Sequence, residues 1–202
     1  GAARGISLDA NGDILFSSFS TLYRFDGETY ECTGRFIPAV LGSMTDGAHD
    51  ATSGMYLIGH VGAGKPVHIL DADFNYFGAA VETVPSLQRS ILIKSVTDGM
   101  DLYFGGIYSG RLYKYHSPDI EFDPFVVVDT LGVFTVETED TTITYNMRAE
   151  CLDWMPDGMM LCGNTRVSEY PNPKNHVFSI LDVETDTYHG DIGTPLHIDD
   201  YL

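Results

Sequence analysis

The sequence predicts an all-β protein built from repeats of one strand unit. A glycine turn followed by a short apolar strand occurs four times, in the segments ANGDILFSS, TSGMYLIGH, TDGMDLYFGG and PDGMMLCGN. Asn-Gly and Asp-Gly pairs between alternating apolar runs are the strongest short-range signal for a β-hairpin. Apolar residues at the helical spacing i, i+3, i+4 and i+7 are not sustained anywhere in the chain. The abundance of Tyr (12), Phe (11) and Gly (21) likewise favours strands and turns.

The four units share one order of elements. A strand precedes each glycine turn, with the sequences GISLDA, GSMTDGAHDA, ILIKSVT and AECLDWM. The apolar strand after the turn leads to another aromatic or β-branched strand: TLYRFDG, PVHILDAD, RLYKYHS and HVFSILDVETD. The longest unit carries an insertion near residues 126–146, which we expect to form an additional hairpin or a long outer strand pair.

The spacing of the units predicts their arrangement. The turn glycines are Gly12, Gly54, Gly99 and Gly158, and they lie 42, 45 and 59 residues apart. Four strands at this spacing are typical of a β-propeller blade. We therefore expect residues 1–202 to form a single domain, a β-propeller of four antiparallel four-stranded blades. The expected blades are residues 1–40, 41–85, 86–145 and 146–193, and residues 194–202 are expected to be a closing strand or the first strand of a next blade.

Two sequence segments resemble known propeller families. CLDWMPDGMMLCG followed by FSILDVETDTY resembles a WD40-type blade, in which Leu181-Asp182 stands where that family has Trp-Asp. GISLDANGDILFSSFSTLYRFDG is similar to blades of the NHL propellers, and VHILDADFNYFG to those of the quinoprotein type. The Gly-His signature of WD40 repeats is missing from its expected places, because Gly59-His60 follows a strand. The resemblance implies the propeller superfold and no particular subfamily.

The number of blades leaves three ways to complete the ring, because propellers close with 4–8 blades. The four blades can close on themselves, with the C-terminal segment completing the first blade. They can instead be part of a larger propeller. Alternatively, another copy of the chain completes the open ends, which produces an oligomer or a filament. An uncovered sheet edge invites such pairing.

The charge and the hydropathy of the chain limit the kinds of partner that we expect. The net charge is −18, which repels phosphate backbones and anionic membranes, so neither nucleic acid nor membrane insertion is expected. No run of about 18 apolar residues indicates a transmembrane helix. The first residues have no apolar targeting segment, and because the chain does not start with Met we interpret it as a processed chain or an excerpt. The acidic surface suits solubility, cations or basic partners.

The three cysteines, Cys32, Cys151 and Cys162, have neither zinc-ribbon nor redox CxxC spacing. Cys151 and Cys162 are expected on neighbouring strands of one hairpin, either as buried thiols or as an antiparallel pair.

A calcium site is the one candidate metal site, and no other cofactor is expected. In DADFNYFGAAVE, the residues Asp71, Asp73, Asn75 and Glu82 match positions 1, 3, 5 and 12 of an EF-hand loop. Position 6, where the loop requires Gly, is Tyr76, and the flanking segments are strands. A polar turn between two outer strands is the competing interpretation.

A tyrosine-rich segment is the candidate ligand-binding surface. In YFGGIYSGRLYKYH, the residues Tyr108, Tyr113 and Tyr115 alternate with small and basic residues, a pattern that suits carbohydrate or protein contacts. The same alternation occurs in any half-buried strand pair. Two histidines, His49 and His60, flank an inner strand, and they either face a central channel or are ordinary polar residues of strands and loops.

No assembled catalytic motif is present, so the predicted function is a non-catalytic β-propeller binding or scaffold module. It is expected to be extracellular or on a cell or virion surface, to bind a protein or a glycan, and to self-assemble into an oligomer or filament. One alternative is a glycan-active propeller hydrolase or lyase with channel-facing carboxylates. The other is a cytosolic WD40-like adaptor for protein interactions.

Overall fold

The protein folds into four separate four-stranded antiparallel sheets. The structure is a computed structural model that describes residues 4–37, 42–61, 66–82, 88–106, 111–120, 123, 125–131, 133–137, 142–146, 149–164 and 178–191. Every regular element within these ranges is a strand. The all-β prediction is therefore confirmed.

Each sheet is a meander in which consecutive strands pair in sequence order. Blade 1 contains β1 (Gly5–Leu8), β2 (Ile14–Ser17), β3 (Leu22–Phe25) and β4 (Cys32–Phe36). Blade 2 contains β5 (Met44–His49), β6 (Tyr56–His60), β7 (Val67–Leu70) and β8 (Tyr76–Val81). Blade 3 contains β9 (Gln88–Val96), β10 (Gly99–Gly106), β11 (Arg111–Ser117) and β12 (Val126–Leu131). Blade 4 contains β15 (Ala149–Trp154), β16 (Met160–Asn164), β17 (Phe178–Asp182) and β18 (Thr187–Asp191).

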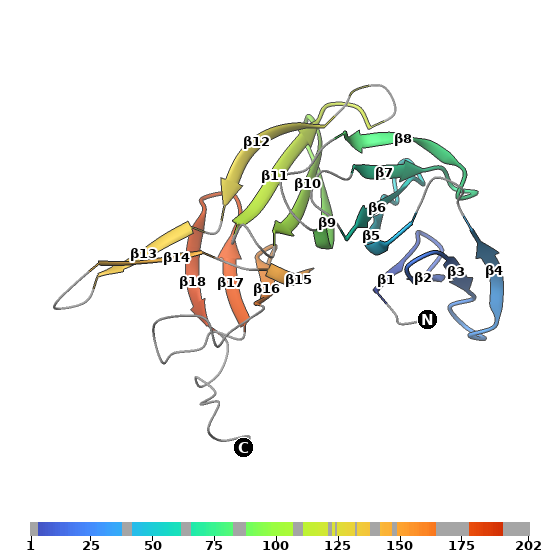
Figure 1. Ribbon diagram of the computed structural model, residues 1–202, viewed down its shortest axis with the longest axis horizontal. Coiled ribbons are helices and arrows are strands. Elements are labelled where there is room, and N and C mark those ends of the chain that lie inside the picture. Colours follow the sequence, from blue (N-terminus) through green and yellow to red (C-terminus); the bar gives the residue numbers. More distant parts are fainter. Residues whose placement is uncertain are drawn as a thin grey trace, which may run out of the picture.

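Of the two structures expected for the insertion in the third unit, the additional hairpin forms. The first part of the insertion is β12, the outer strand of blade 3, which pairs with β11. Its second part is a separate hairpin of β13 (Val133–Glu137) and β14 (Thr142–Asn146). Figure 1 shows this hairpin projecting beside blade 4.

The glycine turns lie where the sequence predicts them, between the first two strands of each blade. Gly12, Gly54, Gly99 and Gly158 all have positive φ, a region that glycine enters without a Cβ clash. At the first turn, the Gly12 amide donates to the Asp9 carbonyl at 3.0 Å, and the Asp9 amide donates to the Asp13 carbonyl at 2.9 Å. These short turns set the antiparallel register of the two innermost strands of each blade.

Alternation along the strands gives each blade two faces, and neighbouring faces pack against each other. Apolar side chains of blades 1 and 2 form one buried cluster, those of blades 2 and 3 a second, and those of blades 3 and 4 a third. The inner strands follow one another in the same order, since β1 contacts β5, β5 contacts β9 and β9 contacts β15. The core is thus three layers of side chains between four sheets.

Among the described residues, no strand pairing closes the four blades into a ring. Figure 1 shows an arc in which blade 1 and blade 4 stand at opposite ends with an opening between β1 and β15. All four strands of blade 1 come from residues 5–36, so that blade needs no strand from elsewhere in the chain. The expected closing strand, residues 194–202, lies outside the described residues.

The described cysteines do not pair. All three are free, and the register places Cys151 opposite Gly163 while Cys162 lies opposite Leu152. The Cys151 and Cys162 side chains therefore point to opposite faces of blade 4, because successive side chains of a strand alternate. Cys162 is buried, and its pKa is raised to about 12, first by burial and then by the neighbouring Cys151. Cys32 and Cys151 are exposed.

Candidate functional site: a groove between the end blades

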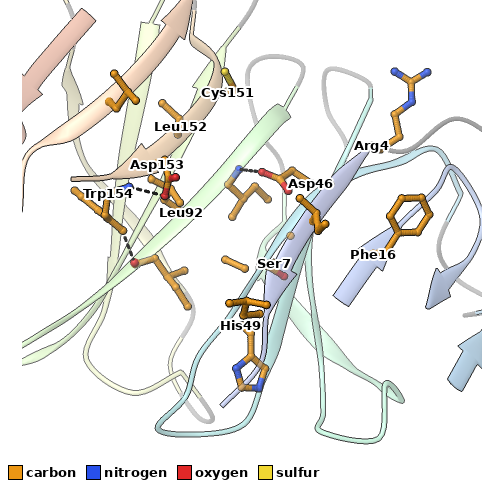
Figure 2. Close-up of a pocket in the computed structure, with 18 of the residues that line it drawn as sticks. Arg4, Ser7, Phe16, Asp46, His49, Leu92, Cys151, Leu152, Asp153 and Trp154 are labelled. Carbon is orange, nitrogen blue, oxygen red and sulfur yellow. Dashed lines mark hydrogen bonds between the residues drawn. The ribbon is translucent and has the colours of Figure 1, made fainter. Parts of the chain in front are cut away.

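A groove of about 840 Å³ lies where the inner strands of all four blades meet. Its floor comes from β5 and β9, and its two walls come from blade 1 and blade 4 (Figure 2). In Figure 2, Arg4 and Phe16 lie on one side of Asp46, while Cys151, Asp153 and Trp154 lie on the other. The groove therefore occupies the gap in the arc, and we call it the notch.

The first wall of the notch belongs to one face of blade 1, which we call the head face and define by Arg4, Ile6, Leu8, Phe16 and Tyr23. All of these except Tyr23 line the notch. Ile6 is 70% exposed and Leu8 is 63% exposed, although both belong to an inner strand. Phe16 and Tyr23 are half-buried neighbours across the sheet, with ring centroids 5.7 Å apart. The opposite face of the same blade is buried against blade 2 through Leu15 and Leu22. In the part of the chain that the structure describes, blade 1 is thus covered on one side only.

The second wall belongs to one face of blade 4, which we call the tail face and define by Cys151, Asp153, Leu161, Ile180 and Asp182. The first three of these line the notch. Cys151 and Asp153 are exposed, and the other three are half-buried. Leu161 lies opposite both Asp153 and Ile180 in the sheet, so these side chains share one face. The other face of blade 4 packs against blade 3 through Leu152, Met160 and Leu181.

Hydrogen bonds across the floor tie the inner strands of the blades together. The Ser90 hydroxyl on β9 donates to Asp46 Oδ2 on β5 at 2.8 Å and accepts from the Leu152 amide on β15 at 3.0 Å. The Ile91 amide also donates to Asp46 Oδ2, at 3.3 Å. Between blades 1 and 2, the Ser17 hydroxyl donates to the Thr45 carbonyl. One hydroxyl, that of Ser90, therefore joins three consecutive blades.

Two titratable groups on the floor have shifted pKa values. Burial raises the pKa of the Asp46 carboxyl, and the nearby charge of Asp153 adds to the increase, while the donors Ser90 and Ile91 oppose it. Burial lowers the pKa of His49, and the charges of Asp9 and Asp50 oppose that shift. Both groups are therefore biased toward their neutral forms.

Of the two candidate channel histidines, His49 lines the notch and His60 does not. The His60 ring lies inside blade 2, with its Nδ1 2.8 Å from the Gly42 carbonyl oxygen and its centroid 4.8 Å from that of His68. The His60 side chain therefore packs against a neighbouring ring of blade 2 and does not line the notch.

The residues of the candidate calcium site are not gathered at one place. Asp71 caps the turn between β7 and β8: its Oδ1 accepts from the Asp73 amide at 2.9 Å and from the Asn75 amide at 2.8 Å. The Asn75 side-chain amide donates to Oδ2 at 3.1 Å. Glu82 follows the six residues of β8, which places it about 20 Å along the strand from this turn. The expectation of one site formed by all four residues is thus wrong, because an extended strand separates Glu82 from the others.

The described residues contain no cluster of three or more His, Cys, Asp or Glu that could hold a metal ion. A calcium site limited to Asp71 and Asp73 stays a prediction.

The tyrosines of the candidate binding surface are part of the core where they are described. Tyr113 and Tyr115 are each 8% exposed and stack on the Phe104 ring, both at 5.3 Å between centroids. Their alternation reflects the packing of blade 3 against blade 2. Tyr108 lies outside the described residues. The structure therefore gives Tyr113 and Tyr115 no free face to offer a ligand.

Sequence reasoning missed the head and tail faces. Ile6 and Leu8 alternate with polar residues as the core residues of any half-buried strand do, so the pattern cannot show that no blade covers them. Asp46, Ser90 and Asp153 lie in strand segments whose sequences match no functional motif. The one sequence feature that pointed to these faces was the number of blades. Four blades that do not close on themselves leave one face of each end blade uncovered.

The fold and the notch define the class of this protein: it is a β-propeller of four blades. No family model and no curated protein matches the chain. Among solved structures, it is similar to dihydro-haem d1 dehydrogenase NirN in complex with DHE, with a TM-score of 0.58 and 13% identity over 96% of this chain and 37% of that one. It is also similar to a chain of a nidogen/laminin complex, with a TM-score of 0.58 and 10% identity over 93% of this chain and 78% of that one.

At these identities the likeness shows the fold alone. The chain spans 37% of the NirN chain and 78% of the nidogen/laminin chain, so the four blades superpose on part of each. Within the part of the chain that the structure describes, no helical segment has the length and hydropathy needed to span a lipid bilayer.

Proposed function

We propose that this protein is a non-catalytic β-propeller module that binds another protein through its notch and serves as a scaffold. The observation that carries this proposal is the exposure of Ile6 and Leu8, at 70% and 63%, on an inner strand of a propeller. Apolar side chains that line a groove, with a polar rim around them, are typical of protein-binding surfaces. The exposed Asp153 carboxylate in the notch favours a partner segment with basic residues.

The carboxylates of the notch support binding better than catalysis. Asp46 already accepts hydrogen bonds from Ser90 and Ile91 of the next blade, so its carboxylate serves to join two blades. Asp153 Oδ1 accepts from the Trp154 amide at 2.8 Å. A glycan hydrolase needs two carboxyl groups that are free to reach a substrate. We therefore assign Asp46 to the architecture of the groove.

The binding proposal is tested with short extended peptides in which Val alternates with Lys, with Ser or with Glu. Binding is measured by fluorescence anisotropy with the intact protein. The Lys peptide should bind best and the Glu peptide worst, and Leu8→Asp should weaken the Lys peptide about tenfold or more, which corresponds to loss of one apolar contact. The matched control is Phe77→Asp, because Phe77 is 49% exposed on β8, away from the notch. Absence of binding by all three peptides, or equal weakening by the control, would refute the proposal.

The proposal places the module outside the cell or on a cell or virion surface, whereas the adaptor alternative places it in the cytosol. Cys32 and Cys151 are exposed and free, so a membrane-impermeant maleimide can label both. Labelling of the native protein on intact cells or particles supports the surface location. Labelling that requires lysis would support the cytosolic adaptor instead.

A further inference from the structure

We propose that the partner of the notch is a second copy of this chain, which docks its tail face on the head face of the first. This inference rests on the proposed function and names the partner of the same surface. The contact involves two different faces of the protein. Each copy binds one neighbour through its head face and another neighbour through its tail face.

The first argument is continuity with the interfaces inside the molecule. We call the face of a blade that points toward the preceding blade its first face, and the opposite face its second face. Each of the three internal interfaces joins the second face of one blade to the first face of the next. Among the described residues, no blade covers the first face of blade 1, which is the head face, or the second face of blade 4, which is the tail face. The two faces are therefore the two halves of the interface that the molecule already builds three times.

The second argument is the composition of the inner strands at equivalent positions. On its first face, β9 presents Ile91, which is 1% exposed against blade 2. On its first face, β15 presents Leu152, which is 8% exposed against blade 3. On the same face of β1, Ile6 and Leu8 remain 70% and 63% exposed. The head face thus has apolar residues at the positions that a neighbouring blade covers elsewhere in the fold.

The third argument is charge, which selects head-to-tail contact over contact between like faces. The head face carries Arg4, and Arg35 lies opposite Tyr23 at its outer side. The tail face carries Asp153 and Asp182. Two head faces would bring arginines together and two tail faces would bring carboxylates together, and both arrangements are unfavourable. A head face against a tail face pairs opposite charges around an apolar centre.

A head-to-tail contact uses two different patches on each copy, so it either closes into a ring or continues as a filament. Native light scattering on a sizing column, from micromolar to millimolar protein, should therefore show species larger than the 22.2 kDa chain. A single 22.2 kDa species over this whole range would overturn the inference.

The decisive experiment uses one variant for each face. Leu8→Asp disables the head face, and Asp153→Arg disables the tail face, and both positions are exposed enough to spare the fold, which circular dichroism verifies. Each variant alone should be monomeric, because its one active face finds no complement. Mixed in equal amounts, they should form a complex of two chains and no larger species. The control Phe77→Asp should assemble as the unmodified protein does.

Two other outcomes would contradict the inference in different ways. If either variant alone still assembles as the unmodified protein does, the contact joins like faces and the head-to-tail assignment is wrong. If the protein stays monomeric while the Lys peptide still binds in a Leu8-dependent way, the notch binds a different partner and the proposed function survives without this inference.

Discussion

The hydroxyl of Ser90 offers the sharpest test of how the blades are held together. Ser90→Ala removes the donor to Asp46 Oδ2 and the acceptor of the Leu152 amide in one change. A buried donor left without a partner costs about 1–3 kcal/mol, and a hydrogen bond to a carboxylate contributes about 1.5–3 kcal/mol. Because the Ile91 amide still reaches Asp46, we expect the free energy of unfolding to fall by about 2–4 kcal/mol.

Urea denaturation followed by tryptophan fluorescence measures this change. The chain has a single tryptophan, Trp154, whose Nε1 donates to the Ile93 carbonyl at 3.0 Å across the interface of blades 3 and 4. Its emission therefore reports separation of those blades. Ser95→Ala is the matched control, because Ser95 is exposed on the same strand, and it should change stability by less than about 0.5 kcal/mol. A loss for Ser90→Ala as small as that of the control would refute the reasoning.

Three further predictions follow from single residues. In the folded Asp153→Arg variant, whose tail face is expected to stay uncovered, a thiol reagent at pH 8 should modify Cys32 and Cys151 but not Cys162, whose pKa is raised to about 12 by burial; rapid reaction of all three would contradict this. Because burial raises the pKa of Asp46, its contribution to stability is greatest below its ordinary pKa of 3.8 and is lost as pH rises through the raised value, so Asp46→Asn should gain stability relative to the unmodified protein between pH 3.5 and pH 7 in urea titrations. A difference between the two that does not change with pH would exclude this shift. Gly47→Ala should lower stability by about 1–3 kcal/mol, because its Cβ would lie 2.7 Å from the Leu57 carbonyl oxygen, whereas Gly78→Ala, with no atom within 4 Å of a Cβ, should not.

Local chemistry accounts for the parts of the structure that the sequence predicted well. Asn11-Gly12, Ser53-Gly54, Asp98-Gly99 and Asp157-Gly158 specify their turns through the positive φ of the glycine, which depends only on adjacent residues. The alternation of apolar residues on both sides then determines which strands pair. The stacking of the blades follows, because each sheet has at least one apolar face that is buried against a neighbouring sheet.

The candidate sites were hard to predict because one residue pattern forms different structures, depending on the elements that follow it and pack against it. The spacing of Asp71 and Asn75 describes an EF-hand loop when a helix follows, but here a strand follows and carries Glu82 away from the turn. Tyr113 and Tyr115 alternate along a strand whichever way it faces, and only the position of Phe104 shows that they face the core.

By itself, the sequence determined the strands, the turns and the repeat, because these depend on contacts between residues close along the chain. Only the tertiary structure decided which faces remain open. Whether Ile6 and Leu8 are covered depends on how far four blades extend around the axis, and that angle arises from packing between whole sheets. The Ser90 hydroxyl likewise acquires its role from strands 44 and 62 residues away in sequence. The notch is therefore a property of the arc, and no single segment of the chain encodes it.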